Sequence, residues 1–144
     1  MQSEGRALLL ANAFIDTRAK LNFSIPAHLQ SAAASGTYIV QSRTPLDAAF
    51  RAQLASAGAE IVSYIPNNAY LVRMTAAGAA QMSGRSGTSA VLPYEPYYKI
   101  NAALLGAAVA QKALPDGAAL TLGLFADDAA RTVAQIEKLG ATVL

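Results

Sequence analysis

The order of strand and helix patterns over residues 37–100 constrains the fold of this chain more than any other feature. Short β-rich segments separated by turn residues and by helical apolar stripes predict six elements. The predicted strands cover residues 37–42, 60–65, 69–74 and 90–94, and the predicted helices cover residues 46–57 and 76–82. The order βαββαβ is that of a ferredoxin-like α+β sandwich, in which two helices cover one face of an antiparallel four-stranded sheet. The second face of the sheet is expected to be open.

Capping and turn residues bound these elements. Asp47 near the start of the first helix and Gly58 after its end are typical boundary residues. Asn67 and Asn68 tolerate the left-handed backbone of a tight turn between the second and third strands. Thr75 is the expected N-cap of the second helix.

Residues 1–36 are expected to form a leader and a linker. An apolar run predicts a helix over residues 6–14, so the leader is expected to be helical. Pro26 suits the first turn of a second, short helix over residues 27–30. The small and polar residues 31–36 are typical of a linker, and we place the first domain boundary there.

The chain after residue 100 predicts part of a second, similar unit. Residues 101–119 are expected to be a connector. Residues 120–125 alternate as a strand does, residues 130–139 carry an apolar stripe at helical spacing, and residues 142–144 begin another strand.

A weak internal repeat supports this second unit. Residues 58–62 align with residues 140–144 at an offset of 82 residues, and the same offset pairs Val40 with Leu122. We therefore predict a partial second copy (βαβ) of the same fold in residues 120–144. It is expected to be completed by a longer chain or by another chain.

Composition indicates a folded chain and excludes two classes of partner. Over 144 residues, a content of 53% hydrophobic and 14% charged residues is sufficient for a packed core. The net charge is only +2 and the basic residues are scattered, so we expect no nucleic-acid partner. No apolar run approaches the ~20 residues of a membrane span. The N-terminus lacks the pattern of a signal peptide, which is expected to be absent or already removed.

No residue pattern predicts catalysis or a cofactor. The chain has no cysteine, which excludes disulfides, thiolate metal sites and a cysteine nucleophile. His28 is the single histidine and has no serine or aspartate at a motif spacing around it. Asp127 and Asp128 suit the N-terminus of a helix better than a metal site. The residues therefore predict a protein that is not an enzyme and that binds no cofactor or metal.

Three segments, taken in order, carry a resemblance to a known family. They are YIVQ at residues 38–41, GAEIVSYIPNNAYLVRM at residues 58–74 and VLPYEPYYK at residues 91–99. They are similar to the opening strand, the central hairpin, and the closing strand with its exit in the N-terminal pro-region of subtilisin-like serine peptidases. This pro-region is also called the propeptide or inhibitor-like domain.

The resemblance implies that the chain binds a subtilisin-like protease domain, in cis or in trans, as folding chaperone and temporary inhibitor. In that family the open sheet face lies on two helices of the protease, and the C-terminal tail enters the active-site cleft like a substrate. The residues expected to bind the partner are Pro93, Tyr94, Glu95, Pro96, Tyr97, Tyr98 and Lys99. The resemblance also implies a secreted or cell-envelope location. An alternative for the tyrosines is that they cover the joint between the two related units.

Two other functions stay open. An incomplete second copy leaves an open sheet edge near residues 120–125 or 142–144, which suits a structural or self-assembly module that takes up a strand from another chain. Paired ferredoxin-like units also bind small ligands in some proteins, so a regulatory ligand-binding module is a third candidate by fold analogy alone.

Overall fold

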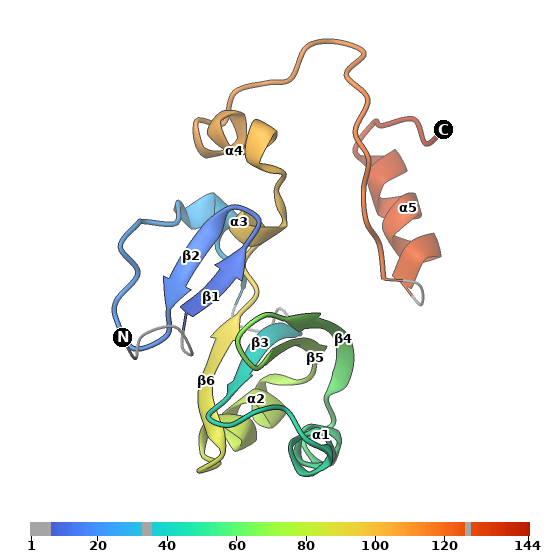
Figure 1. Cartoon of the computed structure of the whole chain (residues 1–144). Helices are drawn as coiled ribbons and strands as arrows, with labels where there is room; N and C mark the ends of the chain where they lie inside the picture. Colours follow the sequence, from blue (N-terminus) through green and yellow to red (C-terminus); the bar gives the residue numbers. More distant parts are fainter. Residues whose placement is uncertain (1–6, 33–35, 126–127) are drawn as a thin grey trace. The chain divides into compact units, whose positions relative to one another are not determined.

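The computed structural model of the chain describes residues 7–32, 36–125 and 128–144 (Figure 1). Its internal contacts divide the chain into a larger unit, residues 1–112, and a smaller unit, residues 113–144. The elements of the larger unit are β1 (Ala7–Leu10), β2 (Ala13–Asp16), the 3₁₀ helix η1 (Ala27–Leu29), β3 (Thr37–Ser42), α1 (Ala48–Ser56), β4 (Glu60–Ile65), β5 (Ala69–Arg73), α2 (Ala76–Ser83), β6 (Thr88–Pro93), α3 (Pro96–Lys99) and α4 (Ala102–Val109). The described part of the smaller unit contains the helix α5 (Ala129–Lys138).

An antiparallel four-stranded sheet lies at the centre of the larger unit, with the strand order β4-β5-β3-β6. The strands predicted at residues 37–42 and 60–65 coincide with β3 and β4. The other two predicted strands differ from β5 and β6 by at most two residues at an end. The predicted mixed α+β class with an antiparallel four-stranded sheet is confirmed.

Local capping explains where the helices of this sheet begin. The side chains of Asp47 and Thr75 each accept a hydrogen bond from the backbone amide three residues ahead, at 2.7 and 3.1 Å. Asn67 and Asn68 have φ angles of 70° and 59°, so the tight turn between β4 and β5 uses the left-handed backbone that asparagine tolerates. These local predictions are confirmed.

The helices α1 and α2 cover one face of the sheet. Phe50 and Leu54 of α1 and Met82 of α2 are buried in one cluster with Val40 of β3 and Val72 of β5. This cluster is the core expected of a sheet packed against two helices.

The other face of the sheet is covered as well. Leu8 of β1, Ile15 of β2, Leu29 of η1 and Tyr98 of α3 form a second buried cluster with Ile39 of β3. All six residues of β3 are buried, as in a strand covered on both faces. The expectation of an open second face is therefore wrong, because the leader and the segment after β6 occupy it.

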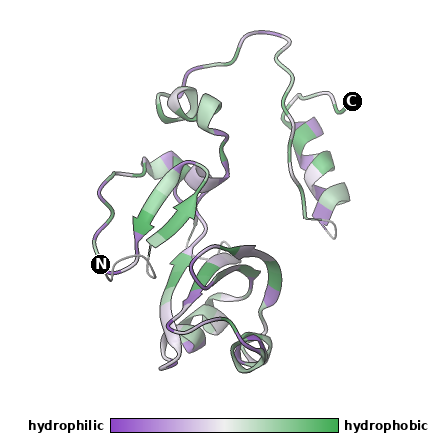
Figure 2. Cartoon of the chain, viewed as in Figure 1, coloured by the Kyte–Doolittle hydropathy of each residue, from purple (hydrophilic) through white to green (hydrophobic). Residues whose placement is uncertain are grey.

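The leader forms a hairpin where the sequence predicted a helix over residues 6–14. Residues 7–10 pair with residues 13–16 in an antiparallel ladder, and most of this hairpin is hydrophobic (Figure 2). Burial follows the strand period, because Leu8 is buried and Leu9 is exposed. A short apolar run does not distinguish a helix from a strand, and packing against the sheet decides between them. The predicted N-terminal helical leader is wrong, whereas the second, short helix of the leader is present as η1.

The smaller unit contains the helix predicted at residues 130–139, confirmed as α5. The strands predicted at residues 120–125 and 142–144 are wrong, because no strand forms in the described residues 113–125 and 128–144. None of these described residues is buried. A helix satisfies its own backbone hydrogen bonds, but a strand requires a partner strand. Of the three elements predicted for a partial second copy, the described residues therefore contain only the helix.

Three sequence predictions fall partly outside the described residues. They concern residue 6 of the predicted leader helix, residues 33–35 of the predicted linker, and Asp127 at the predicted cap of the last helix. Asp128 is described as the N-cap residue of α5, and its carboxylate accepts a hydrogen bond from Arg131 at 2.6 Å.

Candidate partner-binding surface

The exit segment, residues 93–99, begins at the end of the edge strand β6. Pro93 is the last residue of β6, and the Tyr94 amide extends the ladder by donating to the Thr37 carbonyl at 3.0 Å. The helix α3 follows at once and starts with Pro96. Proline has no amide hydrogen, but at the first helical position that hydrogen would have no partner within the helix. The chain therefore turns from a strand into a short helix.

The three tyrosines of the exit segment pack against one another and against the leader. Tyr98 is buried, and its ring centroid lies 6.1 Å from that of Tyr94 and 5.9 Å from that of Tyr97. The ring of Phe23, from the leader, stacks on Tyr97 at 5.6 Å. These are the separations at which aromatic pairs attract one another. The tyrosines thus join the exit segment to the leader.

Two polar side chains of the leader hold the backbone and the carboxylate of this segment. Asn12 donates through Nδ2 to the carbonyls of Tyr97 and Ile100, at 2.7 and 2.8 Å. Ser31 donates its hydroxyl to Glu95 Oε2 at 2.7 Å, and its amide donates to the same oxygen. Sequence reasoning missed both anchors, because they join residues more than 60 positions apart and leave no local signal.

Burial and charge set the protonation behaviour of the segment. Burial raises the pKa of Tyr98 to about 12, and the negative charge of Glu95 and the neighbouring Tyr97 add to this effect. Burial also raises the pKa of Tyr94. The ammonium of Lys99 lies 5.5 Å from the centre of the Tyr94 ring, a cation–π distance. Partial desolvation lowers the pKa of Lys99, while Glu95 acts in the opposite direction.

The seven residues predicted to bind a partner differ in accessibility. Pro93 and Lys99 are exposed, Tyr94, Glu95, Pro96 and Tyr97 are half-buried, and Tyr98 is buried. The accessible ones form a rim beside the hairpin, and Tyr98 lies beneath that rim.

A small open hollow lies between the leader and the end of β6. It is lined by Ile15, Asp16, Thr17, Ala19 and Leu21 of the leader and by Leu92, Pro93, Glu95 and Tyr98. Its volume of about 140 Å³ is below the roughly 300 Å³ at which ligand pockets begin. The hollow therefore suits one inserted side chain of a partner better than a small-molecule ligand.

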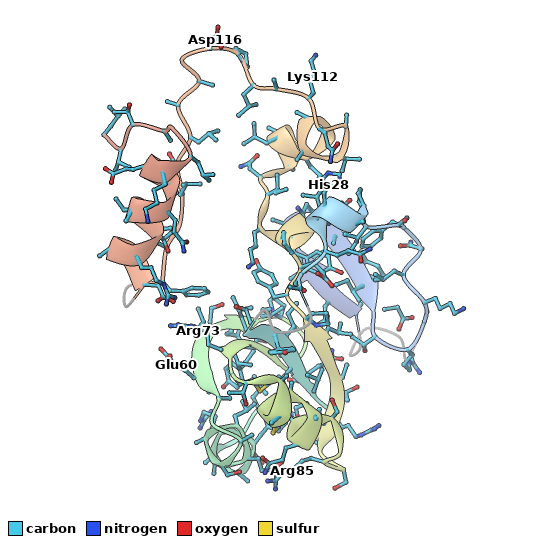
Figure 3. The ribbon with its side chains drawn as sticks, turned by 180° about the vertical axis from the view of Figure 1, so that it is seen from behind. His28, Glu60, Arg73, Arg85, Lys112 and Asp116 are labelled. Atoms are coloured by element: carbon cyan, nitrogen blue, oxygen red, sulfur yellow. The ribbon has the colours of Figure 1, made fainter. Side chains whose placement is uncertain are left out.

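Glu60, Arg73 and His28 of the larger unit take part in structural contacts, and Figure 3 labels all three. Glu60 and Arg73, opposite each other on β4 and β5, form an ion pair at 3.7 Å. His28 donates from Nε2 to the carbonyl of Ala108 at 2.9 Å, which joins η1 to α4. Within the described ranges, no group of three or more acidic, histidine or cysteine residues is arranged to hold a metal ion. Among those same residues, no helix is both long and apolar enough to cross a membrane.

A family model described as Domain of unknown function (DUF8729) matches residues 9–95, which is more than half of the chain. The chain belongs to this family. The DUF8729 match begins at Leu9 within β1, continues through the whole four-stranded sheet and ends at Glu95. Most of the hairpin therefore lies within the DUF8729 match, together with the sheet that it covers. Comparison with curated proteins and with solved structures finds no match for the chain.

Proposed function

We propose that the sheet of the larger unit is a ferredoxin-like sandwich and that the module is a non-catalytic, pro-region-like domain. Two observations support the fold. Its strand order is β4-β5-β3-β6, with β3 and β5 at the centre, and α1 and α2 both pack on one face. In the proposed function the module binds a subtilisin-like serine protease domain as folding chaperone and inhibitor. A partner of that class implies an extracytoplasmic location.

The observation that carries the proposal is the aromatic exit segment, which follows directly from the last strand of the sandwich. Its accessible rim presents Tyr97, Pro93 and Lys99 beside a hollow large enough for a side chain. Tyrosine and proline give a partner large contact areas with little loss of rotamer freedom.

The covered sheet face supports a contact at this rim. In the family that the sequence resembles, the sheet face itself lies on the protease. Here that face buries Leu8 and Ile15 of the hairpin, and exposing such a side chain costs about 1.5–3 kcal/mol. Docking at the rim leaves the hairpin in place and avoids that cost.

Inhibition of subtilisin-type proteases by the purified chain tests the proposal. We expect slow inhibition at micromolar concentration, and faster refolding of a denatured subtilisin-type catalytic domain. Tyr97→Ala should weaken inhibition by about 10-fold, since truncating an interface aromatic costs about 1–2 kcal/mol. Tyr64→Ala is the matched control, because Tyr64 is also partly exposed but belongs to β4.

Thermal unfolding of both variants shows whether the fold is retained. Absence of both inhibition and accelerated refolding would contradict the proposed function. Inhibition that is equally strong in Tyr97→Ala and Tyr64→Ala would contradict the rim as the contact surface.

A second candidate function is structural assembly through the smaller unit. The observation that favours it is a set of large apolar side chains exposed in residues 113–144. They are Leu114, Leu120, Leu122, Leu124, Leu139, Val143 and Leu144.

A further inference from the structure

The helix α5 of the smaller unit ends in the same way as α1, 82 residues earlier. Gly58 and Gly140 follow the two helices in the left-handed conformation, with φ angles of 72° and 90°. Each glycine amide donates to the carbonyl three residues earlier, at 2.9 Å in both cases. The next amide donates to the carbonyl five residues earlier, at 3.0 Å after α1 and 3.4 Å after α5. The helix and its cap therefore repeat at the offset found in the sequence.

The equivalent residues of the two units differ in burial. Val40 is 0% exposed in the core of the larger unit, and its equivalent Leu122 is 55% exposed. Ala57 is 8% exposed, and its equivalent Leu139 is 87% exposed. The smaller unit thus places large apolar side chains at core positions but leaves them in water. Large apolar side chains that are exposed at positions equivalent to a core indicate an interaction surface.

The topology of the larger unit explains why the described part of the smaller unit has no strands. Its sheet consists of two halves, β3-α1-β4 and β5-α2-β6, and the first strands of the halves pair with each other. The second strand of each half pairs with the first strand of the other half, as β4 with β5 and β6 with β3. The two strands of one half are never neighbours. A single half therefore has no strand pairing of its own, which accounts for a helix without strands in the smaller unit.

We propose that residues 119–144 are one half of such a sandwich and that a second copy of this chain supplies the other half. Two copies related by a two-fold axis pair residues 119–124 antiparallel at the centre of a new sheet. Residues 142–144 of each copy lie beside residues 119–124 of the other, and both α5 helices cover one face. Leu122 and Leu139 become buried in this arrangement.

The second copy is the partner that this topology fits. A half contains one inner strand, one helix and one outer strand, so two identical halves complement each other and close without a free inner edge. The inference goes beyond protease binding, because it uses the smaller unit and not the exit segment. This inference also names the partner for the second candidate function, assembly through the smaller unit.

Sedimentation equilibrium of the full chain over a wide concentration range tests this pairing. We expect a reversible monomer–dimer equilibrium, with an increase in β content in the amide I infrared band as the dimer forms. Leu122→Asp and Leu139→Asp should each raise the dimer dissociation constant by at least about 30-fold. Leu9→Asp is the matched control, because Leu9 is an exposed leucine of the hairpin, and it should leave the dissociation constant unchanged.

Each other outcome overturns the proposal. The proposal fails if the chain is a strict monomer at ~1 mM, if a dimer persists in both aspartate variants, or if open-ended polymers form instead of a closed dimer. A chain that dimerises only after addition of another polypeptide contradicts the second copy as the partner. Protease inhibition by Leu122→Asp separates the two proposals, because inhibition depends on the exit segment and dimerisation on the smaller unit.

Discussion

Gly78 shows how a single backbone position sets the distance between α1 and α2. A Cβ atom built at Gly78 would lie closer than 3.0 Å to the carbonyl oxygen of Ala57, at the end of α1. Helix propensity alone ranks glycine about 1 kcal/mol below alanine in a helix. At this position the close approach of the two backbones reverses that ranking.

Gly78→Ala should therefore destabilise the protein, although it improves helix propensity. Overpacking costs about 1–3 kcal/mol, so we expect a net loss of about 1 kcal/mol in the free energy of unfolding, measured by urea denaturation. Gly84→Ala is the control, because a Cβ there meets only ordinary van der Waals contacts. Equal stability of Gly78→Ala and the wild type would show that the helices separate at little cost.

Tyr98 makes the stability of the larger unit fall as the pH rises in the alkaline range. Its pKa is about 12 in the folded chain, against about 10 in an unfolded one. The folded state therefore retains the proton more strongly. The stabilisation is complete below pH 10 and is lost as the pH rises towards about 12. Tyr94 acts in the same direction, and Lys99, whose pKa is lowered, acts in the opposite one.

Tyr98→Phe isolates the contribution of this hydroxyl. We expect the free energy of unfolding to fall less between pH 10 and pH 12 in Tyr98→Phe than in the wild type, by urea denaturation at each pH. Tyr64→Phe changes an exposed ring of β4, and its free energy of unfolding should fall over this pH range as much as that of the wild type. An identical pH dependence in Tyr98→Phe would assign the alkaline loss to other groups.

At the scale of elements, the hairpin β1–β2 is part of the core although the sequence places it in a leader. Leu8 is 0% exposed in the cluster on the second face of the sheet, and its neighbour Leu9 is 63% exposed. The hairpin also reaches the exit segment through Asn12. The two neighbouring leucines therefore offer a matched pair for measuring how much the hairpin contributes.

Leu8→Ala should lower the free energy of unfolding by about 2–5 kcal/mol, because it leaves a cavity against the sheet. Leu9→Ala should change it by less than about 0.5 kcal/mol, as at most exposed positions. Chemical denaturation of both variants makes the comparison. A small effect of Leu8→Ala would mean that the hairpin is not firmly packed on the sheet.

Elements with a local signal were predicted well, and elements whose partners are distant in sequence were not. The strands β3 and β4 and the turn between β4 and β5 follow from β-rich runs and from paired asparagines. The hairpin was mistaken for a helix, because the run ALLL fits both periods. For the candidate site, the seven residues of the exit segment were named from sequence. Its anchors Asn12 and Ser31 were not, since their contacts span the length of the larger unit.

At the scale of the whole molecule, the larger unit holds all the residues found buried in the described chain, and the smaller unit holds none. The larger unit has both halves of its sheet, so every strand of that sheet has a partner. The described part of the smaller unit has one helix, several exposed large apolar side chains and no strand. This difference motivates the pairing of two copies proposed above.

The sequence by itself determined the helices α1, α2 and α5, the N-caps of α1 and α2 and the tight turn, because such elements satisfy their hydrogen bonds among neighbours in the chain. It also determined the β-rich runs of β3 and β4. Only the tertiary structure decided that the leader is a hairpin, that it covers the second face of the sheet, and that residues 120–125 form no strand. The physical reason is that a strand exists only when another strand supplies its hydrogen-bond partners. Which strand does so depends on residues far away in the chain or in another molecule.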